Sequence, residues 1–171
     1  LELSSQAASA APQSSEAQFQ LGMTYLAGDD FDKAKEAFQK TIEVDASHMR
    51  AYCELVSLYT RNAQFDEATE LCEQVKRLNP KEAWAYYELA QVFYQKEDYQ
   101  RAAAELVSTV EISPRYLDAY LLLGQIYYEQ KLDAKALVQF QKALDLSAND
   151  HTALLKAGTL LNRMTRPAEA L

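Results

Sequence analysis

The chain repeats a pattern every 34 residues, most clearly in a column of alanines at Ala34, Ala68, Ala102, Ala136 and Ala170. A fixed period in this range is typical of a helical array, in which each repeat buries its apolar face against its neighbours. Such arrays seldom carry out chemistry and more often present a surface to a partner. The period therefore favours an interaction protein, and the functional question becomes where its surface lies.

Each period contains the signals of two helices. Leu89, Ala90 and Phe93 recur at the spacing of one helical face, and a second apolar helical pattern follows after a short polar turn. Pro80 and Pro114 interrupt the pattern between periods, because proline lacks the backbone donor and disfavours helix before it. Each period is therefore predicted to be a hairpin of two helices of about a dozen residues.

Two further columns predict how the helices of a hairpin pack together. A small residue on one helix allows close approach, and a large residue from the paired helix fills the space beside it. The small column holds Gly22, Val56, Ala90, Gly124 and Gly158, and the large column holds Phe38, Cys72, Leu106 and Phe140.

The order of these residues resembles the tetratricopeptide repeat family. The pattern is Leu-Gly, then Tyr, then Ala, then Phe, at Leu21, Gly22, Tyr25, Ala34 and Phe38 and again at Leu123, Gly124, Tyr127, Ala136 and Phe140. The resemblance implies an all-α, right-handed superhelical solenoid of antiparallel helix pairs. We expect four full repeats at 15–48, 49–82, 83–116 and 117–150, and a truncated fifth at 151–171.

The rest of the composition limits compartment and anchoring only in part. Residues 1–14 are rich in Ser, Ala and Gln and are predicted to be a flexible linker. Cys53 and Cys72 give no disulfide framework and are expected to be unbridged thiols, which leaves a cytoplasmic or a periplasmic location open. No apolar run approaches the roughly 20 residues of a membrane span, so we expect no direct membrane insertion.

The sequence contains no recognised catalytic or cofactor motif. The net charge of −8 argues against a nucleic-acid partner, because phosphate binding needs a basic surface. His48 and His151 fall at junctions between periods, outside any metal-ligand pattern, and are expected to be surface loop residues. Phosphate-binding glycine loops and nucleophile elbows are missing too. We therefore expect no metal, no cofactor and no enzymatic activity.

The first helix of each period carries a second stripe beyond its core positions. In the third period this stripe holds Trp84, Tyr87, Gln91 and Tyr94. In the tetratricopeptide repeat family the same stripe lines a concave groove that binds peptides or helices. The resemblance thus implies thirteen groove residues: Phe19, Met23, Arg50, Cys53, Trp84, Tyr87, Gln91, Tyr94, Leu121, Gln125, Tyr128, Leu155 and Arg163. The alternative is that these aromatic residues pack between neighbouring repeats.

The leading hypothesis is a non-catalytic scaffold that binds a protein or peptide through apolar and aromatic anchors. Charges on the stripe nearly cancel, with Glu16, Asp118 and Glu129 opposing Arg50, Arg61 and Arg163, so we expect modest salt dependence. One alternative is a self-assembling scaffold, formed through an open C-terminal end where the helix around residues 154–161 lacks a partner. Another is the docking arm of a larger enzyme.

Overall fold

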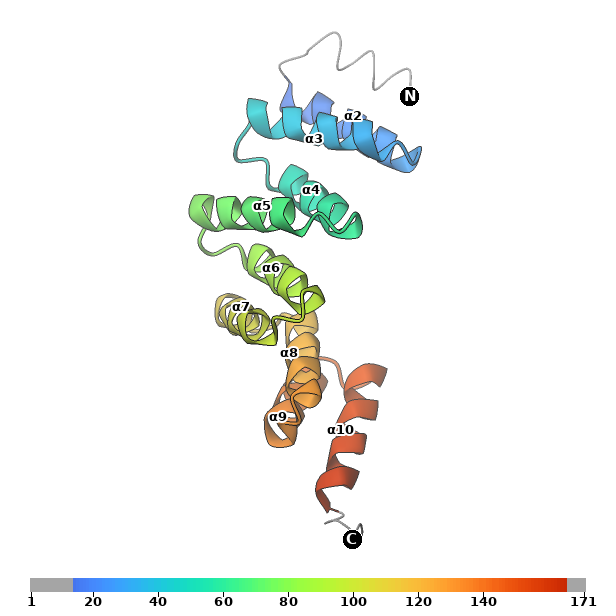
Figure 1. Cartoon of the computed structure of the whole chain (residues 1–171), viewed down its shortest axis with the longest axis vertical. Coiled ribbons are helices and arrows are strands. Elements are labelled where there is room, and N and C mark those ends of the chain that lie inside the picture. The colour runs from blue at the N-terminus through green and yellow to red at the C-terminus, as the bar shows by residue number, and fades with distance from the viewer. Residues whose placement is uncertain (1–13, 166–171) are drawn as a thin grey trace. The chain divides into compact units, whose positions relative to one another are not determined.

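The computed structural model describes residues 14–165, and every regular element in that range is an α-helix (Figure 1). The chain forms two compact units, Leu1–Pro80 and Lys81–Leu171. The N-terminal unit contains α2 (Ser15–Ala27), α3 (Phe31–Val44), α4 (Met49–Arg61) and α5 (Phe65–Leu78). The C-terminal unit contains α6 (Ala83–Gln95), α7 (Tyr99–Ile112), α8 (Leu117–Glu129), α9 (Asp133–Leu146) and α10 (His151–Thr165). The predicted all-α class is confirmed.

The turn inside each hairpin has the same backbone geometry in every repeat. One residue adopts a left-handed conformation, with φ between 56° and 59°, at Asp29, Ala63, Glu97 and Lys131. In the third repeat the N–H of Glu97 donates to Tyr94 O at 3.0 Å, and the N–H of Asp98 donates to Phe93 O at 2.9 Å. These two bonds form a Schellman motif, which satisfies the last carbonyls of the first helix.

The residue that closes this motif also begins the second helix in two of the repeats. Asp98 Oδ1 accepts a hydrogen bond from Arg101 N at 3.1 Å, and Asp30 Oδ1 accepts one from Lys33 N at 3.4 Å. A side-chain acceptor at this position satisfies a backbone donor that the helix leaves unpaired. The hairpin therefore reverses direction within three residues. Its register holds even at α9, where Asp133 occupies the position taken by aromatic residues in α3, α5 and α7.

The helices of a hairpin approach closely at glycine. A Cβ atom built on Gly22 would lie 2.5 Å from Phe38 Cε1, and one built on Gly124 would lie 2.8 Å from Phe140 Cε1. Both phenylalanines are completely buried. The sequence-based expectation that a large ring fills the space beside the small column is confirmed in these two hairpins.

Three sequence-based expectations concern other positions. Ser14 is not part of a linker, because its Oγ accepts a hydrogen bond from Ala17 N at 3.2 Å and caps α2. The rest of the expected linker, residues 1–13, and the end of the truncated repeat, residues 166–171, lie outside the described residues. Cys53 is half-buried on α4 and Cys72 is buried on α5, and these two residues form no disulfide.

The two helical glycines of the C-terminal unit provide a matched test of this packing. Gly124→Ala is expected to lower the free energy of unfolding by about 1–3 kcal/mol, because the buried Phe140 ring has to move. Gly158→Ala is expected to raise it by up to about 1 kcal/mol, because no atom lies within 4 Å of the new methyl group and alanine favours helix. Urea denaturation followed by circular dichroism measures both changes, and equal effects would contradict the packing described here.

Candidate functional site

In the N-terminal unit, Phe19 is a core residue. Its ring is completely buried, with its centroid 5.6 Å from that of Phe38 and 4.8 Å from that of His48. The guanidinium of Arg50 lies over the ring at 4.6 Å from its centroid. The prediction that Phe19 lines an open groove is therefore corrected, and this ring follows the alternative in which the aromatic stripe packs inside the protein. Met23 and Cys53 are half-buried, and Arg50 is exposed.

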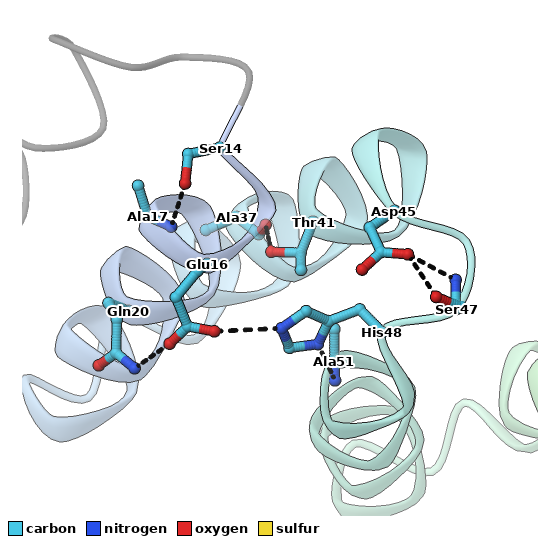
Figure 2. A network of polar contacts seen from close by, with 10 residues as sticks. All are labelled: Ser14, Glu16, Ala17, Gln20, Ala37, Thr41, Asp45, Ser47, His48 and Ala51. Atoms are coloured by element: carbon cyan, nitrogen blue, oxygen red, sulfur yellow. Dashed lines mark hydrogen bonds and ion pairs between the residues drawn. The ribbon is translucent and has the colours of Figure 1, made fainter.

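His48 makes polar contacts with the start of α4 and with the start of α2 (Figure 2). Its Nδ1 accepts a hydrogen bond from Ala51 N at 3.3 Å, and its Nε2 lies 3.5 Å from Glu16 Oε2. Because Nδ1 is an acceptor, the ring proton sits on Nε2 and points to the carboxylate. The side chain is only 12% exposed, so the expectation of a surface loop residue is wrong.

The same network occupies the carboxylate of Glu16. Gln20 Nε2 donates to Glu16 Oε1 at 2.7 Å, and this bond, followed by the contact with His48, holds the pKa of Glu16 below its usual value. Hydrogen bonds to the charged form of a carboxylate favour that form. Glu16 therefore serves the junction between two helices rather than an open stripe.

In the C-terminal unit, hydrogen bonds join the first helices of two neighbouring repeats. The hydroxyl of Tyr94 on α6 donates to Glu129 Oε1 on α8 at 2.7 Å. Gln125 Nε2 donates to the same oxygen at 2.6 Å. Burial first, and then this carboxylate, raise the pKa of Tyr94 to about 12. The network places residues of α6 and α8 on one continuous surface.

Two pairs of tyrosine rings flank this network. The Tyr87 ring centroid lies 4.9 Å from that of Tyr116, which precedes α8, and the Tyr94 centroid lies 5.7 Å from that of Tyr99. Such separations fall within the range of favourable aromatic pairs. Burial raises the pKa of Tyr87, and the nearby carboxylates of Asp118 and Glu88 act in the same direction.

These contacts define a surface that we call the α6/α8 face. It includes Tyr87, Tyr94 and Gln125, which make these contacts. We add Gln91 and Leu121, half-buried residues of the same two helices that the sequence predicts on the same stripe. Tyr99 extends it toward a shallow, open depression at the turn between α6 and α7, which is lined by Lys96, Glu97, Asp98, Tyr99, Gln100 and Gln130.

Tyr128 and Arg163 also meet, but on the side of α10. The ring of Tyr128 lies 4.5 Å from Lys156 Nζ and 4.8 Å from the guanidinium carbon of Arg163. Arg163 forms a bidentate ion pair with Asp133, in which Nε lies 2.6 Å from Oδ2 and Nη2 contacts Oδ1. Tyr128 and Leu121 pack against the buried cluster of α8, α9 and α10. Both Tyr128 and Arg163 are thus engaged within the protein.

The remaining two predicted residues differ in exposure. Trp84 is half-buried near the start of α6, whereas the side chain of Leu155 on α10 is 71% exposed. Leu155 is the most exposed of the large apolar residues that the structure describes. It therefore belongs to a separate surface of α10.

The residues that recur every 34 positions did not reveal the contacts between neighbouring repeats. Tyr99 and Tyr116 were not predicted, although each stacks against a predicted residue. Glu129 was noted as a charge only, yet it accepts the hydroxyl of Tyr94 from 35 residues away. That separation is one period plus one residue. A search of the sequence for polar pairs 35 residues apart on neighbouring first helices could therefore have found this contact.

Metal and membrane sites find no support in the part of the chain that the structure describes. Between residues 14 and 165, no group of three or more His, Cys, Asp or Glu side chains is placed to hold a metal ion. Over the same range, no helix is long and apolar enough to cross a membrane.

The stacked helix hairpins define a helical-repeat protein of the solenoid class, and the family models agree. A model for the second ARM domain of tetratricopeptide repeat protein 21 matches residues 46–131. Two tetratricopeptide repeat models match residues 16–47 and 117–150. The chain belongs to the tetratricopeptide repeat family. No curated protein matches it in sequence.

Solved structures share this fold. A crystal structure of MamA protein has a TM-score of 0.77 at 22% identity, covering 88% of this chain and 82% of that one. The pilF protein of Pseudomonas aeruginosa has a TM-score of 0.76 at 23% identity, covering 88% and 69%. YrrB, described as a TPR protein with an unusual peptide-binding site, has a TM-score of 0.73 at 18% identity, covering 95% and 84%. At these identities the likeness concerns the fold alone.

The bond between Tyr94 and Glu129 is testable by titration. Glu129→Gln is expected to lower the pKa of Tyr94 from about 12 toward its usual value of about 10, while burial keeps it above that value. The Tyr94 ring carbon signal in NMR spectra, assigned with Tyr94→Phe, reports this pKa. Glu111→Gln, an exposed change on α7, is the control and is expected to leave the pKa unchanged.

The same shift has a consequence for stability. The folded-state pKa of Tyr94 lies above the unfolded value. The contribution of protonated Tyr94 to the free energy of unfolding is therefore complete below about pH 10 and is lost as the pH rises toward 12. A Tyr94 pKa that stays near 12 in Glu129→Gln would show that burial alone sets it.

Proposed function

We propose that this chain is a non-catalytic scaffold whose C-terminal unit binds an extended segment of a partner protein across the α6/α8 face. The observation that carries the proposal is the network of Tyr94, Glu129 and Gln125, which joins two repeats into one surface. Residues held on rigid helices in this way need little ordering when a ligand binds, and that favours affinity.

The chemistry of the face suits a peptide backbone. The side-chain amides of Gln91 and Gln125 each offer donors and an acceptor, as an extended peptide requires. The rings of Tyr87 and Tyr94 supply apolar area with a polar tip, a combination enriched in binding surfaces. The peptide-binding site named for the YrrB structure supports the proposal by analogy of fold only.

The thirteen predicted residues then separate into four groups. The α6/α8 face is the proposed centre of binding, with Trp84 near the start of the same helix α6 and Tyr128 and Arg163 toward α10. Leu155 lies on a separate surface of α10. Met23, Arg50 and Cys53 in the N-terminal unit are candidates for a second contact surface, whereas the buried ring of Phe19 is not available to a ligand.

A peptide library tests the proposal. Twelve-residue peptides are selected on the full chain, and their dissociation constants are measured by fluorescence polarisation. The double variant Tyr87→Ala with Gln125→Ala is expected to bind at least about tenfold more weakly, because it removes a ring and an amide from the face. Val107→Ala with Val138→Ala, at exposed positions of the second helices, is expected to bind normally. Equal losses in both variants, or none, would refute the proposed location.

A second candidate function, self-association, is favoured by the surface of α10. We propose that two copies of the chain pair through it. Four large apolar side chains there are 46–71% exposed: Leu154, Leu155, Leu161 and Met164. A Cβ on Gly158 would meet no atom within 4 Å, so another helix has room to approach. Several large exposed apolar side chains on one helix are typical of an interface.

Sedimentation velocity over a range of protein concentrations tests self-association. The unmodified chain is expected to shift toward a dimer as its concentration rises, and Leu155→Glu is expected to stay monomeric because a charge enters this surface of α10. Val138→Glu, at an exposed valine on α9, is the control and is expected to dimerise normally. A chain that stays monomeric at every concentration would rule out this role.

A further inference from the structure

The carboxylates beside the α6/α8 face lack cationic partners. Between residues 14 and 165, no ion pair engages Glu88, Asp118 or Glu129. Glu88 is half-buried on α6, and this burial raises the pKa of its carboxyl group. A half-buried carboxylate without a partner favours a ligand that brings a positive charge.

The cations that were expected to balance the stripe are engaged elsewhere. Arg50 and Arg61 belong to the N-terminal unit, where they lie over the rings of Phe19 and Phe31. Arg163 is paired with Asp133 and lies over Tyr128. The near-cancellation of charge in the sequence therefore does not hold beside the α6/α8 face, where these three arginines do not pair with Glu88, Asp118 or Glu129.

Aromatic rings accompany these carboxylates. The hydroxyl of Tyr94 donates to Glu129 Oε1 at 2.7 Å. The ring centroid of Tyr87 lies 4.9 Å from that of Tyr116, and Asp118 follows Tyr116 by two residues. Four tyrosine rings elsewhere in the chain are covered by the protein's own cations, namely Tyr25, Tyr120, Tyr127 and Tyr128. Within the described residues, no cation lies over Tyr87, Tyr94 or Tyr99.

A ring beside a carboxylate is well suited to a guanidinium or an ammonium group. The ring attracts the cation through its face, and the carboxylate pairs with the charge. The face offers this combination twice, at Tyr87 with Asp118 and at Tyr94 with Glu129. Tyr87 and Tyr94 are seven residues apart on α6, which corresponds to about 10 Å along the helix axis.

We infer that the partner segment carries two basic side chains three residues apart, one bound at each of these positions. The inference rests on the proposed function, and charge complementarity identifies the occupant. A chain in the polyproline II conformation has three residues per turn and rises about 3.1 Å per residue, so side chains three apart lie on one side about 9 Å apart. That spacing matches the two tyrosines.

Synthetic peptides test the inference on the full chain. The probe is a fluorescent twelve-residue peptide with arginines three residues apart in a background of Pro, Ser and Gly. Its counterparts carry Gln or Glu at the same two positions. The arginine peptide is expected to bind at least about tenfold more tightly than the glutamine peptide, and more weakly as salt rises. The glutamate peptide is expected not to bind.

Charge variants locate the effect. Glu88→Gln with Asp118→Asn is expected to weaken the arginine peptide about fivefold and leave the glutamine peptide unchanged. The control, Glu105→Gln with Glu111→Gln on α7, removes the same net charge and is expected to change neither. Equal weakening by both variants would show general attraction to an acidic protein and would overturn the inference.

Failure of this inference is distinguishable from failure of the proposed function. Library peptides that bind the face without basic residues would overturn the inference and leave the proposed function standing. Library peptides whose affinity is insensitive to Tyr87→Ala with Gln125→Ala would overturn both.

Discussion

Close packing of glycine against a phenylalanine ring is the contact on which the α2–α3 and α8–α9 hairpins depend. At Gly22 and Gly124 the rings of Phe38 and Phe140 occupy the space that a Cβ atom would need. In these two hairpins the contact fixes which side of the first helix meets its partner. Gln125 follows Gly124 by one residue, about 100° around the helix. Packing of the core thereby determines which side chains remain available for the surface.

The turn of each hairpin has the same length in four repeats. A left-handed residue ends the first helix and the second helix begins two residues later, so the repeat length is kept. Constant length places equivalent positions of α6 and α8 side by side, and Tyr94 then reaches Glu129. The contact between Tyr94 and Glu129 follows from this register. The proposed binding surface thus depends on the repeat.

The features that recur in the repeats were predictable from the sequence, whereas contacts made by a single side chain at one junction were not. The helix pairs and the glycine–phenylalanine contacts recur, so their columns revealed them. The left-handed turn residues Ala63, Glu97 and Lys131 carried no glycine signal. Phe19 is buried because His48 and Arg50 close around it, and both residues are particular to that junction. Such contacts depend on individual side chains from neighbouring helices and do not recur with the 34-residue period.

Binding of a partner segment to the α6/α8 face is testable by a two-dimensional NMR titration of the isotopically labelled chain with the arginine peptide. If the segment binds there, the largest shifts occur in the side-chain amides of Gln91 and Gln125 and in the rings of Tyr87 and Tyr94. Shifts confined to the second helices α7 and α9, or to α10 around Leu155, would contradict it.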